Sequence, residues 1–116
     1  MLPKPGRINK NLFDLVMKEG SSVYSPILSL HSISWPQDEP MKSLFAFVVP
    51  VKFIKTAVSR NKLKRRGRQI VSKSLTKIKK SYLGIFFFKP EALTLAFKNL
   101  EEEMLKLLNR AGLLIR

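Results

Sequence analysis

The chain has 116 residues and no cysteine, and its 22 lysines and arginines against 8 aspartates and glutamates give a formal net charge of +14 at pH 7. This length fits a single domain, a 45% apolar content excludes a wholly disordered chain, and the lack of cysteine excludes a disulfide framework and thiol chemistry. The net charge points to nucleic acid or to an anionic membrane surface as a partner. The apolar runs are too short to cross a bilayer, and we expect a cytoplasmic protein.

The first expected elements are an extended arm and a short helix. Residues 1–8 hold two prolines and a glycine and lack the apolar segment of a secretory signal. Asn9 or Asn11 can cap a helix from Lys10 to Lys18, which Gly20 ends. This helix has more apolar residues than one core face needs, so we expect it to present an apolar ridge to a ligand.

Three strands are expected next. Ser25-Pro26 separates a short strand near 22–24 from a longer one that ends near residue 34, and residues 35–40 (WPQDEP) form a turn. Residues 42–51 give the strongest strand signal in the chain. Their nearly continuous apolar character predicts a central strand that is covered on both faces.

The segment from Lys52 to Lys80 holds twelve of the 22 lysines and arginines and no acidic residue. Thr56 is a plausible N-cap for a long helix from Ala57 to about Ile78. We expect Gly67 to pack closely against the sheet, because it lies on the side of the helix where apolar and small residues recur at helical spacing. These residues are Leu63, Gly67, Ile70, Val71, Ser74 or Leu75, and Ile78.

Cationic residues and one asparagine fall on another side of the same helix: Arg60, Asn61, Lys64, Arg65 and Arg68. Like charges one turn apart repel each other by roughly 0.2–0.5 kcal/mol per pair, and a bound polyanion relieves that repulsion. A merely solvated helix face usually carries interspersed acids, which are absent here. The Asn61 amide has no helix-propensity reason to be present, but it can cap a backbone group or hold an arginine in place.

A second apolar strand (82–88) and an amphipathic helix that Gly112 ends complete the chain. The element order is therefore helix, three strands, helix, strand, helix. This order predicts one α+β domain over residues 1–116, a two-layer sandwich with a single mixed sheet of four strands and a long basic crossover helix.

Residues for hydrolytic chemistry are not evident. The single histidine, His31, cannot form a metal cluster alone, and taken by itself it is more often an ordinary strand residue than a functional one. Glu101, Glu102 and Glu103 are consecutive, so they point in different directions around a helix and are expected to be solvated. We predict no catalytic residue and no protein-bound metal.

Residues 55–66, KTAVSRNKLKRR, resemble the KxAVxRNRxKR signature of the bacterial ribonuclease P protein subunit. Residues 19–23, EGSSV, resemble a segment that follows the first helix in that family, and Arg7 and Phe13 fall where the family has a basic residue and an aromatic one. The resemblance implies a ribosomal protein S5 domain 2-like fold. It also implies the small subunit of a ribonucleoprotein whose RNA removes the 5′ leader of precursor tRNA, with Mg²⁺ held mainly by RNA and substrate.

The implied partners are the catalytic RNA and precursor tRNA, with no membrane and no obligate protein partner. Carried over by position, the RNA-binding residues are Lys52, Lys55, Arg60, Asn61, Lys62, Lys64, Arg65 and Arg68. The implied cleft for the single-stranded leader lies between the first helix and the sheet and contains Phe13, Met17 and His31.

Three positions depart from the family pattern. Lys62 stands where arginine is usual, Met17 where a second cleft aromatic is common, and Val51 and Phe53 where basic residues are common. Most of these departures concern the leader cleft, and one, Lys62, concerns the RNA-docking helix. The alternatives are a structural RNA-binding protein, such as a ribosomal protein, and, more remotely, a helix that binds a membrane surface.

Overall fold

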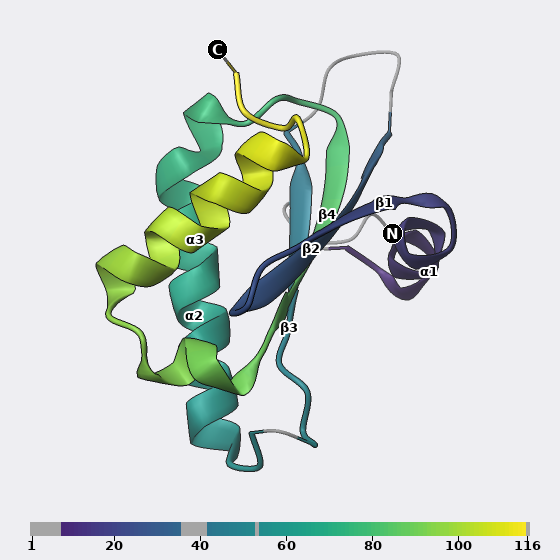
Figure 1. Cartoon of the computed structure of the whole chain (residues 1–116). Helices are drawn as coiled ribbons and strands as arrows, with labels where there is room; N and C mark the ends of the chain where they lie inside the picture. Colours follow the sequence, from purple (N-terminus) through teal and green to yellow (C-terminus); the bar gives the residue numbers. More distant parts are fainter. Residues whose placement is uncertain (1–7, 36–41, 53, 116) are drawn as a thin grey trace.

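The computed structural model describes residues 8–35, 42–52 and 54–115 (Figure 1). The predicted order of helices and strands is confirmed, and two short 3₁₀ turns, η1 and η2, are added to it. The elements are α1 (Lys10–Glu19), β1 (Ser21–Tyr24), β2 (Leu28–Ser34), β3 (Leu44–Val48), α2 (Ala57–Ser74), η1 (Leu75–Lys77), β4 (Tyr82–Phe88), η2 (Pro90–Thr94) and α3 (Phe97–Arg110).

One four-stranded sheet, in the order β1-β2-β4-β3, forms the middle of the molecule. The pairs β1–β2 and β2–β4 are antiparallel, whereas β3 and β4 run parallel and are connected through α2. The mixed sheet with a long crossover helix is therefore confirmed. The predicted arm at residues 1–8, Arg7 included, lies almost wholly outside the described residues.

The prediction of a central position for the strand at 42–51 is wrong. β3 is an edge strand whose strand neighbour is β4, and it is shorter than expected. Its apolar residues reflect coverage of its two faces, with Phe45 in one core cluster and Ala46 against the other. Coverage of a strand's two faces does not decide whether other strands hydrogen-bond to both of its sides. The two inner positions of the sheet belong to β2 and β4 instead.

The two faces of the sheet are covered by different helices (Figure 1). Along β4, Phe86 and Phe88 belong to the large core formed with α2 and α3, and Leu83 and Ile85 belong to a smaller core with Val16 of α1. The alternation of side chains along a strand produces this division. The surfaces of α1 and α2 that face solvent therefore lie on opposite sides of the sheet.

α2 is amphipathic as predicted. The Thr56 hydroxyl accepts a hydrogen bond from the Ser59 amide at 3.3 Å, and the predicted apolar side is buried. A Cβ atom on Gly67 would lie 2.7 Å from the Phe47 ring, which confirms the expected close approach to the sheet. The α-helix ends at Ser74, before Ile78, and η1 follows it.

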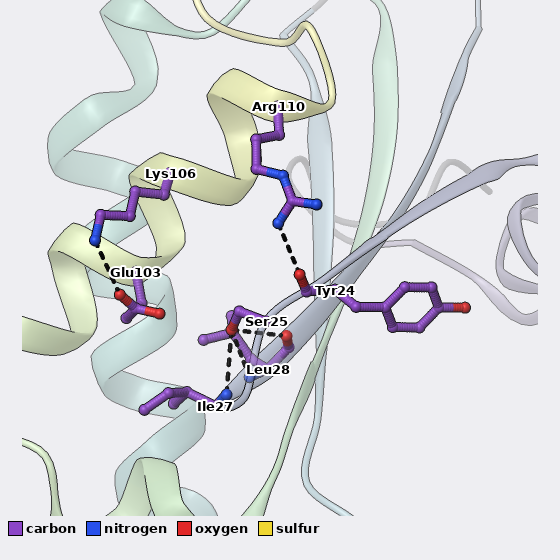
Figure 2. A network of polar contacts seen from close by, with 7 residues as sticks. All are labelled: Tyr24, Ser25, Ile27, Leu28, Glu103, Lys106 and Arg110. Atoms are coloured by element: carbon purple, nitrogen blue, oxygen red, sulfur yellow. Dashed lines mark hydrogen bonds and ion pairs between the residues drawn. The ribbon is translucent and has the colours of Figure 1, made fainter.

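The C-terminal part of the chain is tied to the rest by polar contacts. Lys79 donates its amide to the Leu113 carbonyl, and Glu101 of α3 forms an ion pair with Lys73 of α2 at 3.0 Å. Glu103 pairs with Lys106 within α3 itself, at 3.4 Å (Figure 2). The expectation of solvated glutamates therefore holds for Glu102 alone, since the other two are half-buried and paired. No helix among the described residues is both long and apolar enough to span a membrane.

The junction between α1 and β1 supplies a test of the packing that places α1 on the sheet. A Cβ atom on Gly20 would lie 2.5 Å from the Val16 carbonyl oxygen and 2.7 Å from the Ser32 carbonyl oxygen. Because both atoms belong to the backbone, we expect Gly20→Ala to lower the free energy of unfolding by about 1–3 kcal/mol in urea denaturation. The exposed neighbour Ser21→Ala should change it by less than ~0.5 kcal/mol. Equal stability of the two variants would contradict the close approach.

Candidate nucleic-acid interface

The predicted RNA-binding residues of α2 divide into two groups. Asn61, Lys62, Arg65 and Arg68 are exposed, whereas Arg60 and Lys64 are half-buried. Arg65 and Arg68, with Gln69, Ser72 and Lys73, line a shallow, open depression along the outer face of the helix. The helix therefore presents a continuous cationic surface to solvent.

Arg60 has a structural function that the sequence did not reveal. Its Nη1 donates hydrogen bonds to the carbonyl oxygens of Ile54 (3.0 Å) and Lys55 (2.8 Å), so it fixes the loop that precedes α2. The structure does not support the expected role of the Asn61 amide, because within the described part of the chain it makes no hydrogen bond. The arginine is held by carbonyl groups instead.

One flank of α2 is occupied by the C-terminal elements. Arg66 donates to the Leu95 carbonyl at 3.3 Å, and Lys73 pairs with Glu101 of α3. Helical geometry places Lys64 and Arg68 on the other flank. Within the described residues, no hydrogen bond or ion pair engages the side chains of Lys62, Lys64, Arg65 and Arg68, so these charges are available to a ligand.

Lys52 and Lys55 are exposed in the loop between β3 and α2. β3 leaves the sheet beside Phe87, because Val48 is paired with Phe87 in the parallel register. The loop therefore begins at the Phe87 end of the sheet and leads into the cationic face of α2. Phe53, in the same loop, lies outside the described residues.

On the opposite face of the sheet, four rings form what we call the aromatic row: Phe13, Phe87, His31 and Tyr24. The ring centroids of Phe13 and Phe87 are 6.3 Å apart, those of Phe87 and His31 5.1 Å, and those of His31 and Tyr24 6.0 Å. Each contact is of the edge-to-face type. Two predicted cleft residues, Phe13 and His31, thus come together through a third ring that was not predicted.

Met17, the third predicted cleft residue, follows Phe13 by one helical turn and is 43% exposed. It lies on the same flank of α1 as Phe13 and forms the apolar ridge that the helix composition predicted. α1 covers Leu83 and Ile85 of β4 and leaves the end that carries Phe87 less covered.

Sequence reasoning missed Phe87 and Tyr24. Alternation within Tyr82–Phe88 predicts that Phe87 shares a face with Leu83 and Ile85, but only the register of β2 with β4 brings it to His31. Likewise, Tyr24 reaches the row because β1 folds back on β2, which pairs Tyr24 with Ser29. The strand alternation was visible in the sequence, but the cross-strand neighbours were not.

His31 is oriented by its neighbours on β1. Its Nδ1 lies 2.7 Å from the Ser22 hydroxyl, the residue paired with it across the strands. Burial lowers the pKa of the His31 imidazole below its usual value of 6.5, which favours the neutral ring at pH 7. A neutral ring in contact with Phe87 adds an aromatic surface and no positive charge. His31 thus packs against Phe87 and Tyr24 and joins these two rings in the row.

The family model and the curated relatives that match this chain all belong to one family. The family model described as Ribonuclease P matches residues 2–112. The chain is 31% identical to the ribonuclease P protein component of Synechococcus sp. (strain JA-2-3B'a(2-13)), over 99% of this chain and 88% of the relative. It is 33% identical to the ribonuclease P protein component of Acholeplasma laidlawii, over 91% of this chain and 88% of the relative.

Solved structures agree with the fold. The RNase P protein of Staphylococcus aureus matches with a TM-score of 0.82 at 22% identity, over 97% of this chain and all of that one (100%). The RNase P protein of Thermotoga maritima matches with a TM-score of 0.79 at 26% identity, over 93% and 97% of the two chains. The family model, which covers nearly the whole chain, and the two relatives at 31% and 33% identity establish that the chain belongs to the ribonuclease P protein family.

Proposed function

We propose that this chain binds the catalytic RNA of ribonuclease P through α2 and the 5′ leader of precursor tRNA through the cleft between α1 and the sheet, with Phe13, Met17 and His31 as the leader-contacting residues. One observation carries the proposal: the cationic face of α2 and the aromatic row lie on opposite faces of one sheet. A protein with two such surfaces can hold two RNA segments at once. The RNA-binding residues in this proposal are Lys52, Lys55, Arg60, Asn61, Lys62, Lys64, Arg65 and Arg68.

The two surfaces differ in chemistry: one carries cations that bind phosphates, and the other carries aromatic rings that stack on bases. Lysine and arginine neutralise phosphates and release counterions, which gives strong binding without reading the base sequence. Aromatic rings stack on unpaired bases, each contributing about 1–3 kcal/mol, whatever the base. A folded catalytic RNA offers phosphates, and a single-stranded leader offers unpaired bases.

Arg60 serves the first surface indirectly as well. Its two hydrogen bonds fix the loop that carries Lys52 and Lys55, so these lysines are held near the start of α2. An ordered loop loses less conformational entropy on binding than a mobile one. We propose that Arg60 both organises this loop and contributes its charge to RNA docking.

In this proposal the RNA carries the hydrolysis of the phosphodiester bond. The described residues include no group of three or more histidine or carboxylate side chains that could hold a metal ion, and we assign no metal-ligand role to them. We propose that Mg²⁺ is held mainly by RNA and substrate phosphates. The protein would lower the Mg²⁺ demand by screening phosphates and would keep the leader in register. The proposed setting is the cytoplasm, where precursor tRNA is processed.

The test is reconstitution with a bacterial ribonuclease P RNA and a precursor tRNA at low Mg²⁺. We expect the protein to stimulate accurate removal of the 5′ leader over RNA alone, as measured by gel analysis of the cleaved 5′ end. A ribosomal-type RNA-binding protein would bind RNA without this stimulation. Folded protein that leaves the cleavage rate unchanged would refute the proposal.

Arg65→Ala and Arg68→Ala test the docking surface. Each should reduce the slope of log affinity against log salt concentration by roughly one unit, because one phosphate contact is lost. The measurement is a salt titration of binding to the catalytic RNA without tRNA. Lys18→Ala on α1 removes the same charge from an exposed site across the sheet and should leave the slope unchanged. Equal effects of all three substitutions would indicate only non-specific attraction.

Phe13→Leu tests the leader cleft. Leucine keeps apolar packing against Val16 and Phe87 but removes the ring, so the fold should persist while stacking is lost. We expect affinity for precursor tRNA in the assembled complex to fall by about 1–3 kcal/mol, with affinity for mature tRNA unchanged. Equal losses for both tRNAs would rule out a leader-specific role.

A further inference from the structure

Tyr24, at one end of the aromatic row, has no role in the cleft derived above. Its side chain is 59% exposed, whereas Phe13, His31 and Phe87 are half-buried. Within the described part of the chain, its hydroxyl makes no hydrogen bond. Core packing therefore does not account for this ring, and it is the most accessible surface of the row.

The ring lies on the face of the sheet that carries the rest of the row. Val23 packs into the core with α2 and α3, and alternation along β1 directs Ser22 and Tyr24 to the opposite face. There Ser22 contacts His31 through its hydroxyl, and Tyr24 contacts the same imidazole edge-to-face at 87°. In Figure 2 the Tyr24 ring points away from α3.

The backbone of Tyr24 is held from the other side of the strand. Arg110, in the last turn of α3, donates from Nη1 to the Tyr24 carbonyl at 2.7 Å (Figure 2). β1 is an edge strand, whose backbone groups have no strand partner on one side. The charged donor therefore satisfies this carbonyl and fixes the strand beneath the ring.

Hydrogen bonds also hold the turn that follows Tyr24. Lys89 donates to the Ser25 carbonyl at 2.9 Å, and the Ser25 hydroxyl accepts from the amides of Ile27 and Leu28 at 3.2 Å each (Figure 2). The hairpin is thus ordered before any ligand arrives. A pre-ordered aromatic ring loses little conformational entropy when it binds a partner.

We propose that Tyr24 is a second stacking site for an unpaired base of the leader, at the opposite end of the row from Phe13, and that Arg110 positions it. The inference rests on the leader binding proposed above and extends it from α1 to the edge of the sheet. Phe13 and Tyr24 are separated by His31 and Phe87, so the two ends of the row contact different nucleotides of the leader. Tyr24 thereby determines how long a leader the protein senses.

An unpaired base suits this site better than a phosphate. Tyr24 carries no charge, and the cations beneath it, Arg110 and Lys89, are committed to backbone carbonyls. An accessible, uncharged ring at the end of a line of rings can stack on any base. Specificity at this position would therefore be for single-stranded character and length rather than for base identity.

The test uses the assembled complex and a series of precursor tRNAs whose leaders increase one nucleotide at a time. Tyr24→Ala should weaken binding by roughly 5- to 100-fold once the leader reaches the site, taking tenfold as ~1.4 kcal/mol of stacking, and by nothing for leaders that do not reach it. Tyr24→Phe keeps the ring and should match the wild type throughout. The leader length at which Tyr24→Ala first matters should differ from the length at which Phe13→Leu does.

The outcomes separate this inference from the function it rests on. If wild-type binding is independent of leader length, both the proposed leader binding and the second stacking site at Tyr24 are refuted. If Phe13→Leu reduces leader binding while folded Tyr24→Ala equals the wild type at every length, the second stacking site alone is refuted. An equal loss for all leaders, the shortest included, would also refute it, because a stacking contact with one nucleotide cannot act before that nucleotide is present.

Arg110 is tested through its dependence on Tyr24. Arg110→Ala should weaken binding of long leaders in the wild-type background and have less effect when combined with Tyr24→Ala, since its contribution passes through that ring. Short leaders should be unaffected by either substitution. Strictly additive losses in this double-mutant cycle would show that Arg110 acts on the RNA independently, and the positioning role would be wrong.

Discussion

The arrangement of the whole protein depends on β4, one of the two inner strands of the sheet, which is buried on both faces. Its sequence, YLGIFFF, places large apolar side chains on both sides, and each side requires a separate covering layer. Phe86 and Phe88 are covered by α2 and α3, while Leu83 and Ile85 are covered by α1. Residues of β2 and β3, among them Ile33 and Leu44, complete the smaller core under α1. Without apolar side chains of β4 on this face, α1 would lose the central part of its packing surface, and the aromatic row would lose Phe87.

This constraint explains why the two candidate RNA surfaces are separate. α2 buries its apolar side on the large core, so its cations face away from the sheet, and the row occupies the face that α1 covers incompletely. The connection is the loop between β3 and α2, which starts beside Phe87 and is fixed by Arg60. Two RNA segments bound to these surfaces would be held at a distance set by the thickness of one sheet and one helix layer.

Much of this fold was predictable because it depends on local signals. The caps at Asn9 and Thr56 and the periodicity of α2 and α3 act within a few residues, so they define the helices from sequence alone. The position of β3 was predicted wrongly, since an apolar run reports coverage of the faces but not the number of strand neighbours. Phe87, Tyr24 and the Arg60 contacts were missed for a related reason: each depends on register or on a neighbouring carbonyl.

The basic residues of the sequence motif in α2 make different contacts in the structure. Within residues 60–66, the side chains of Arg60 and Arg66 donate hydrogen bonds to backbone carbonyls, whereas those of Lys62 and Arg65 do not. The charges that lack such a contact within the described residues, those of Lys62, Lys64, Arg65 and Arg68, face one another along the helix and repel at helical spacing. Those charges gain most from a phosphate. The same basic motif therefore contains residues that hold backbone carbonyls and residues whose charges are available to a ligand. The hydrogen bonds distinguish the two groups better than burial does, since Lys64 is half-buried but makes no such bond within the described residues.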